Sequence, residues 1–190
     1  MLAVPRVFLC AGHELGGGAA AGGLRENPYN ARVGVLSTAE LRRRGVEAWL
    51  APLTMRPYPE DVRAKVAWVN RRAASSDLAI DIHLDIGRPG CAAFARERPP
   101  DLALADAVAE ELARSTGLRC RGGLPERETA AGRLAFLHGV CCRGLLIELC
   151  SMNTGDADFA RSPGAVAAFA RGLAEGCIAV LEIGARLADD

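Results

Sequence analysis

The run Asp81-Ile82-His83-Leu84-Asp85 places an imidazole between two carboxylates inside an otherwise apolar segment. Apolar residues occupy the even positions from 78 to 86, so the three ionisable side chains would share the opposite face of a strand, where side chains alternate with period two. Burying three such groups together costs free energy unless something compensates for it. A metal ion is the commonest compensation, and the pattern therefore favours a metal site.

Two other polar residues are placed to complete this site. His13 follows the apolar run 7–11, which is typical of a fully covered parallel strand, and Glu26 lies just before a helix that starts near Asn27-Pro28. In open α/β sheets ligands bind beyond the carboxyl ends of the strands, where His13, Glu26 and His83 would meet. Two histidines and one carboxylate, with a fourth position open to water, form the ligand set of catalytic zinc in hydrolases.

A further carboxylate, Glu148, ends the apolar run Leu145-Leu146-Ile147, where an acid has no structural reason to be. We interpret it as a general base, and a buried ion pair with Arg143 or Arg133 is the alternative. Asp81 and Asp85 are interpreted as groups that orient a metal-bound imidazole or end the strand. His138 is predicted to end another strand and is a weaker candidate for substrate contact.

The elements that position these residues follow from apolar periodicity and helix-boundary signals. Strands are predicted at 7–11, 46–53, 78–86, 134–137 and 145–149, with a short edge strand at 90–95. Helices are predicted from Asn27 to Gly45, from Pro59 to Ala73, from Pro99 to Gly117 and from Ser162 to Leu187. This alternation indicates an α/β fold: a single-domain three-layer sandwich over residues 1–190, with a twisted, mostly parallel sheet of about six strands and helices on both faces.

Composition excludes several classes of function. The 23 basic and 23 acidic residues balance, so no global positive field favours nucleic acid or an anionic membrane surface. No apolar stretch approaches the roughly 18 residues of a membrane span, and the N-terminus lacks the features of a secretory signal, so we expect synthesis to end in the cytoplasm. The seven cysteines, without a CxxC pair, do not resemble a disulfide framework or a zinc knuckle.

Taken together, the segments resemble the zinc-dependent N-acetylmuramoyl-L-alanine amidases of the amidase type 3 family, nearly from end to end. The residues that carry the resemblance are Val7 to His13, Glu26, Asn70, Ser76 to His83, Leu145 to Glu148, Asn153 and Asp156. In that family the matching positions hold the first metal histidine, the metal glutamate, the second metal histidine and the catalytic glutamate.

The resemblance implies one Zn²⁺ per chain, held by His13, Glu26 and His83, with Glu148 as the catalytic base and Asn153 as a candidate for substrate contact. Zinc of this kind lowers the pKa of a bound water from 15.7 toward about 7. The implied substrate is peptidoglycan, cut at the amide between N-acetylmuramic acid and L-alanine. Such a cell-wall lytic enzyme would be a phage endolysin or an autolysin that reaches the wall after release or by another export route.

Several positions depart from the family pattern. Cys10 stands where the family usually has an aspartate, and Asp81 and Asp85 replace its usual serine and asparagine. The segment after Glu148 is about one residue shorter and lacks the family's aromatic residue. About a dozen residues separate Ile86 from Pro99, too few for the inhibitory helix of division amidases. We therefore expect a compact catalytic domain without an obligate protein partner.

Three other functions are compatible with parts of the sequence. A dinucleotide-binding loop is disfavoured, because the glycines from Gly12 to Gly23 lack the GxGxxG spacing and the second strand lacks an acidic ribose partner. Another zinc amidohydrolase or carboxypeptidase, acting on a small acylated amino acid or peptide, is the nearest rival. A catalytically silent wall-binding module is the third possibility, although it would be expected to have lost at least one of the four polar residues.

Overall fold

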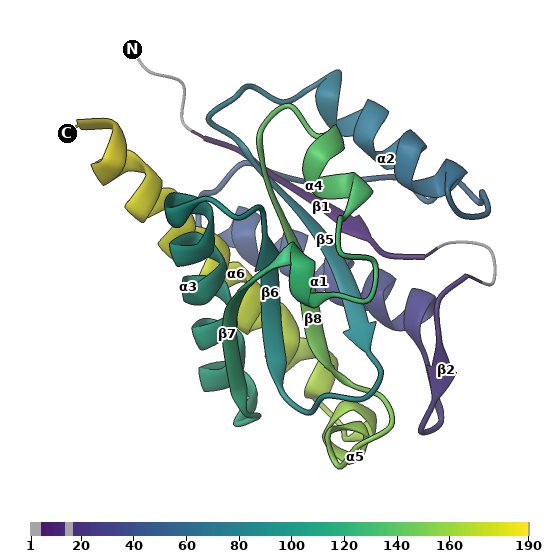
Figure 1. Cartoon of the computed structure of the whole chain (residues 1–190). Helices are drawn as coiled ribbons and strands as arrows, with labels where there is room; N and C mark the ends of the chain where they lie inside the picture. The colour runs from purple at the N-terminus through teal and green to yellow at the C-terminus, as the bar shows by residue number, and fades with distance from the viewer. Residues whose placement is uncertain (1–4, 14–16, 190) are drawn as a thin grey trace.

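The computed structural model describes residues 5–13 and 17–189, which form a mixed six-stranded sheet between two helical layers (Figure 1). The strands are β1 (Val7–Ala11), β2 (Ala20–Ala21), β3 (Leu24–Arg25), β4 (Ala48–Leu50), β5 (Leu78–Asp85), β6 (Cys91–Ala95), β7 (Cys120–Pro125) and β8 (Arg143–Ser151). The helices are α1 (Glu26–Arg43), α2 (Glu60–Asn70), α3 (Pro99–Thr116), the 3-10 turn η1 (Glu126–Glu128), α4 (Ala135–Gly139), α5 (Asp156–Arg161) and α6 (Ala165–Asp189). The predicted three-layer α/β architecture is confirmed.

The sheet has the strand order β4-β1-β5-β8-β6-β7, while β2 and β3 form a separate short hairpin. Neighbouring strands from β4 to β8 are parallel, β6 runs antiparallel to β8, and β7 is parallel to β6. The sheet is thus mostly parallel, as predicted. In such a sheet β1, β5 and β8 are central strands, which explains why their sequences are rich in buried apolar residues.

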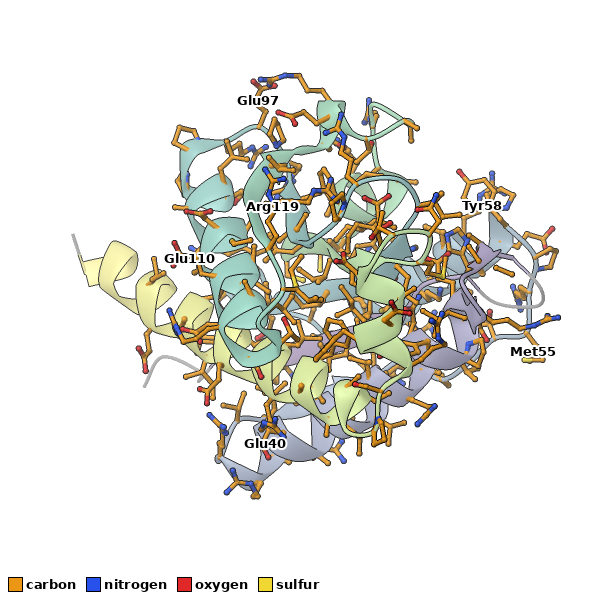
Figure 2. The ribbon with its side chains drawn as sticks, turned by 90° about the horizontal axis from the view of Figure 1, so that it is seen from below. Glu40, Met55, Tyr58, Glu97, Glu110 and Arg119 are labelled. Atoms are coloured by element: carbon orange, nitrogen blue, oxygen red, sulfur yellow. The ribbon has the colours of Figure 1, made fainter. Side chains whose placement is uncertain are left out.

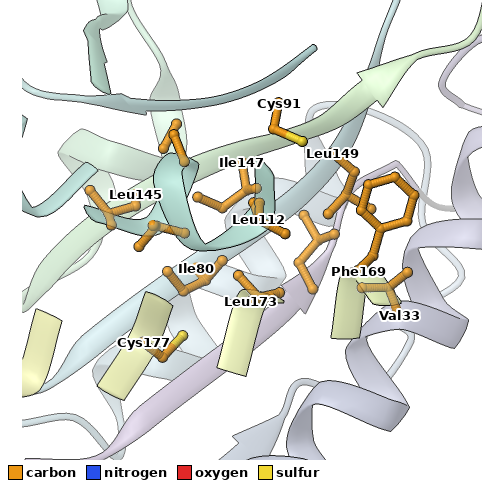
Figure 3. Packing of buried hydrophobic residues seen from close by; sticks show 14 of the residues in the cluster. Val33, Ile80, Cys91, Leu112, Leu145, Ile147, Leu149, Phe169, Leu173 and Cys177 are labelled. Carbon is orange, nitrogen blue, oxygen red and sulfur yellow. The ribbon is translucent and has the colours of Figure 1, made fainter. Parts of the chain in front are cut away.

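Alternation along the strands divides the apolar residues between two cores. The larger core, on the face covered by α1, α3 and α6, contains Ile80 of β5 and Ile147 of β8 (Figure 3). Ile82 of β5 belongs to the same core. The smaller core, on the face of α2 and α4, contains Phe8 of β1 and Leu146 of β8. Since Asp81, His83 and Glu148 alternate with residues of the larger core, they face the α2 and α4 side.

The predicted edge strand at 90–95 is wrong in position, because β6 lies inside the sheet between β8 and β7. All five residues of β6 are buried, as expected of an interior strand. The edge strand next to β6 is β7, which the sequence did not reveal because Gly122 and Gly123 interrupt its apolar pattern. A Cβ at Gly123 would lie 2.4 Å from the backbone nitrogen of Asp106, so this glycine lets the edge strand pack directly on α3.

The predicted strand at 134–137 is also wrong, because most of this segment belongs to the short helix α4. A four-residue apolar run does not distinguish a strand from a buried helical turn. Here Phe136 and Leu137 are buried in the smaller core, and a Cβ at Gly139 would lie 2.9 Å from Val66 of α2. His138 therefore lies on a helix rather than at a strand end.

Several boundaries differ from those predicted. The first helix already begins at Glu26, the second strand of the sheet spans only Ala48–Leu50, and the last helix begins at Ala165 rather than at Ser162. Within the described residues, none of the helices is both long and apolar enough to cross a membrane.

Candidate metal centre and catalytic site

The candidate site lies where β1, β5 and β8 end, on the sheet face of α2 and α4. His13 follows β1, His83 is near the end of β5, and Glu148 of β8 pairs in register with His83. Glu26 comes from the opposite helical layer, as the first residue of α1. Its side chain reaches the rim of the sheet, where its Oε1 accepts a hydrogen bond of 3.2 Å from the backbone N–H of Leu84.

His13, Glu26 and His83 form one cluster, in which one possible ligand atom from each lies within 4.8 Å of the others. Nδ1 of His83 is 3.0 Å from Oε1 of Glu26, and Nε2 of His13 is 3.7 Å from the same oxygen. The two imidazole rings meet edge to face, with their centroids 4.8 Å apart. The other carboxylate oxygen of Glu26 accepts a hydrogen bond of 2.9 Å from the N–H of Ala19, which fixes the carboxylate in the cluster.

Two glycines make room for this cluster. A Cβ at Gly12 would lie 2.4 Å from the imidazole of His83, and a Cβ at Gly18 would lie 2.8 Å from Oε2 of Glu26. Gly18 also has a φ of +81°, which favours glycine. The side-chain amide of Asn27 donates to the carbonyl of His13 and so ties the loop after β1 to α1. Gly12 and Gly18 thus leave the space that the side chains of His83 and Glu26 occupy in the cluster.

The electrostatics of the cluster fit a cation. Burial would lower the pKa of His83, but the carboxylates of Asp81 and Glu26 outweigh burial and raise it well above its usual value. Burial and the neighbouring His83 lower the pKa of His13. The pKa of Glu26 is lowered, since its contacts with the two histidines outweigh the effect of burial. Carboxylates therefore surround the two imidazoles of the cluster. Imidazole nitrogens and carboxylate oxygens are ligands that zinc prefers.

Glu148 lies beside this cluster, with one of its carboxylate oxygens, Oε2, buried and without a hydrogen-bond partner among the described residues. Burial, with the nearby charges of Asp85 and Glu26, raises its pKa to about 8. No described ion pair joins Glu148 to Arg133 or Arg143, so the structure does not support the alternative reading as a buried ion-pair partner. A poorly solvated carboxylate with a raised pKa is characteristic of an acid–base catalyst.

The remaining sequence candidates are placed differently from one another. Oδ2 of Asp81 lies 3.0 Å from Nε2 of His83, so Asp81 touches the cluster. Asp85 instead forms an ion pair of 2.5 Å with Arg121. Asn153 accepts hydrogen bonds from the N–H of Gly87, at 2.7 Å, and from the hydroxyl of Ser151, at 2.9 Å.

His138 stands apart from the cluster. Its Nε2 is 2.6 Å from Oε1 of Glu126, whose other carboxylate oxygen accepts a hydrogen bond of 2.7 Å from the N–H of Leu134. Cys10, at the position where an aspartate was expected from the family pattern, is buried in the smaller core. The structure thus brings Asp81 to the metal-ligand cluster and gives Asp85, Asn153 and His138 other partners.

Two cavities flank Glu148. The first, of about 410 Å³, is lined by His13, His83 and Glu148 and by apolar side chains, including Val62, Leu134, Phe136 and Leu146. The second, of about 470 Å³, is lined by Glu148, Asp85, Arg88, Arg121 and Glu128. Thr129 and Ala130 line both cavities, so the segment after η1 forms the wall between them.

Among the residues that line these cavities, sequence reasoning missed Tyr58 and the segment after η1. Tyr58, which precedes α2, lines the first cavity and is exposed at the surface of the molecule (Figure 2). The wall segment Thr129–Leu134 carries no apolar period and no cluster of ionisable residues, so no local signal marks it as part of a site. Gly12, by contrast, could be recognised from the sequence, because a glycine directly before a candidate ligand often permits a close approach.

Comparison with solved structures shows that this is the fold of peptidoglycan amidase catalytic domains. The N-acetylmuramoyl-L-alanine amidase AmiC2 of Nostoc punctiforme matches with a TM-score of 0.79 and 20% identity, over 95% of this chain and 98% of that one. The catalytic domain of the amidase CwlV of Paenibacillus polymyxa matches with a TM-score of 0.78 and 18% identity, over 94% and 99% of the two chains. The catalytic domain of the endolysin CD27L, which targets Clostridia difficile, matches with a TM-score of 0.74 and 21% identity, over 92% and 97%.

The sequence itself also matches a family. A family model described as N-acetylmuramoyl-L-alanine amidase matches residues 7–179, and the chain belongs to this family of hydrolases. No curated protein sequence matches it significantly. The family assignment confirms the resemblance seen in the sequence.

Proposed function

We propose that this protein hydrolyses the amide bond between N-acetylmuramic acid and L-alanine in peptidoglycan, with one zinc ion held by His13, Glu26 and His83. The observation that supports this proposal most strongly is the convergence of these three side chains, from separate parts of the chain, beside Glu148, whose buried Oε2 has no hydrogen-bond partner among the described residues. A bound zinc ion would supply Lewis acidity for the attacking water and for the scissile carbonyl. Co²⁺ and Mn²⁺ suit similar ligands, so the experiments below include metal identification.

Each residue of the chain then has a distinct task. Glu148 accepts a proton from the attacking water and delivers it to the departing amine of alanine. Asp81 positions the imidazole of His83 through its contact with Nε2. Glu26 is held by two backbone N–H groups, so its carboxylate is oriented before any ligand arrives. The products are the lactyl carboxylate of the sugar and a peptide with a free N-terminal alanine.

We propose a single catalytic domain over residues 1–190 that acts on the cell wall, as an endolysin or an autolysin, without an obligate protein partner. The absence of a spanning helix in the described residues and the similarity to the endolysin CD27L support this setting.

Digestion of purified peptidoglycan tests the proposed function. We expect the wild-type protein to release intact stem peptides with new N-terminal alanine, detected by mass spectrometry of the soluble products. Metal analysis should find about one zinc ion per chain. Chelation should abolish release, and added Zn²⁺ should restore it. Glu148→Gln serves as the matched control because it removes the proposed base and keeps the three metal ligands.

Other outcomes would assign one of the rival functions. Cleavage only inside the peptides, or only of small acylated amino acids, would identify a different zinc amidohydrolase or a carboxypeptidase. Binding to peptidoglycan without any cleavage by the zinc-loaded protein would identify a wall-binding module that has lost turnover.

A further inference from the structure

The two cavities beside Glu148 differ in the arginines that line them. The first cavity is lined by the acids Asp61, Asp81 and Glu148 and by one arginine, Arg133, and much of its remaining lining is apolar. The second cavity is lined by the two arginines Arg88 and Arg121 together with the acids Asp85, Glu128 and Glu148. Both cavities are therefore adjacent to the proposed base, because Glu148 lines both of them.

The second cavity continues into a third. The third cavity, of about 310 Å³, shares Arg88, Arg121 and Glu128 with the second and adds Arg119 to its lining. We call the second and third cavities together the arginine groove. Arg119 lies on the β7 side of the molecule, well apart from Tyr58 of the first cavity (Figure 2).

The arginines of this groove have guanidinium nitrogens that are not engaged in ion pairs and are available to bind a ligand. Arg121, with only 9% of its side chain exposed, is fixed by its ion pair with Asp85, which holds one of its terminal nitrogens. Arg88 is 66% exposed and lies 3.9 Å from Glu128, a contact too long for a hydrogen bond. The guanidinium of Arg119 forms no ion pair with any described residue. Guanidinium groups bind carboxylates through paired hydrogen bonds.

We propose that the arginine groove binds the carboxylates of the stem peptide, whereas the first cavity takes the muramyl sugar. This inference rests on the proposed function and adds the direction in which the substrate lies across the site. The peptide that follows the scissile amide carries free carboxylates on its glutamate and at its end, whereas the sugar is uncharged apart from the lactyl group that forms the amide. The first cavity offers Tyr58 and apolar walls to the sugar, and Asp61 and Asp81, which do not line the second cavity, disfavour the carboxylates of the peptide there.

A pair of soluble substrates tests this direction. One is N-acetylmuramoyl-L-alanyl-D-glutamate with both glutamate carboxyls free, and the other is the same compound with both carboxyls as carboxamides. We expect the zinc-loaded wild type to favour the acid by roughly 10- to 100-fold in kcat/KM, mainly through KM, as typical of hydrogen bonds to charged groups. Arg88→Gln should reduce this preference by about tenfold.

Two further variants separate charge recognition from general damage. Arg121→Gln combined with Asp85→Asn removes the internal ion pair without leaving an unpaired carboxylate, and we expect it also to reduce the preference for the acid. Arg133→Gln is the matched control, because Arg133 is an exposed arginine that lines the first cavity only. An unchanged preference in Arg88→Gln and in the double variant, or a loss of preference in Arg133→Gln, would overturn the proposed direction.

A binding measurement keeps this test separate from the proposed function. If the wild type cleaves neither compound, the proposed function fails, and calorimetry with the dipeptide L-alanyl-D-glutamate still decides the role of the groove. Tighter binding of this dipeptide than of its diamide, lost in Arg88→Gln and kept in Arg133→Gln, supports an acidic-peptide site. Equal binding of the dipeptide and its diamide rejects it.

Discussion

The two faces of the sheet are built from the same strands and serve different purposes. On the face of α1, α3 and α6, the alternating residues Ile80, Ile82 and Ile147 are completely buried in the larger core. On the face of α2 and α4, the next residues along the same strands, His83 and Glu148, border cavities. Of two adjacent residues in one strand, one therefore stabilises the core and the other lines the candidate site. Substitutions at such neighbours should separate the two properties.

The largest effect is expected at Glu148. Glu148→Gln keeps the shape of the side chain but removes the proposed base, so we expect kcat to fall by roughly 10²- to 10⁴-fold, about 3 to 5 kcal/mol of barrier. Zinc content, measured on the purified variant, should stay at the wild-type level. Glu110→Gln, on the exposed surface of α3, is the control and should keep full activity. Wild-type turnover in Glu148→Gln would remove Glu148 from the mechanism.

The preceding residue, Ile147, should show the opposite behaviour. Its side chain is fully buried in the larger core, so Ile147→Ala should lower the free energy of unfolding by about 2 to 4 kcal/mol in a denaturant titration. The kcat of the folded protein should change by less than about tenfold, because the side chain points away from the site. Ile147→Val should lose only about 0.5 to 1.5 kcal/mol of stability. A loss of kcat as large as that of Glu148→Gln would contradict the division between faces.

Asp81 tests whether the polar face acts through the metal ligands. Asp81→Asn removes the charge that lies beside Nε2 of His83, and we expect zinc affinity to fall by about 10- to 100-fold, as for other groups that orient metal-bound histidines. Competition with a chelator of known affinity measures this change. Asp101→Asn, on the outer helix α3, is the control. Unaltered zinc affinity in Asp81→Asn would show that Asp81 only stabilises the metal-free cluster.

The difference between the two faces of the sheet also explains which site residues could be predicted from the sequence. Period-two alternation in β5 placed His83 opposite the isoleucines, and the apolar run before Glu148 marked that acid as anomalous. Both signals are local, since each depends on a contrast between adjacent residues of one strand. The apolar run of β1 and the glycine beside His13 were informative for the same reason.

Features that depend on distant contacts could not be read in this way. The edge strand β7 is held by packing of Gly123 on α3, and α4 is helical because Phe136 and Leu137 fit the core beside α2. Because residues 134–137 were predicted as a strand, His138 was predicted to lie at a strand end. It lies on α4 instead, and its partner is Glu126, twelve residues earlier. The pairing of Arg121 with Asp85, 36 residues away, likewise leaves no mark in the local pattern.

The smallest expected effect is a pH dependence of the free energy of unfolding, caused by the buried carboxyl group of Glu148. In the metal-free protein, burial and the charges of Asp85 and Glu26 raise the pKa of Glu148 to about 8, while His83 and Arg121 act in the opposite direction. Between about pH 4.5 and 8 the folded state then holds a proton that the unfolded chain has released, so this residue makes stability fall as pH rises.

Glu148→Gln cannot make this contribution. We expect the metal-free variant to be more stable than the metal-free wild type at pH 8, by about 1 to 2 kcal/mol, with the difference shrinking toward pH 4.5. Urea titrations of both proteins in chelator, across this range, measure the difference. The protonation of His83 also changes stability over these pH values, but it is present in both proteins and largely cancels. A difference that does not vary with pH would mean that the Glu148 carboxylate is solvated well enough to ionise normally, and the strand would then carry its catalytic acid at no cost in stability.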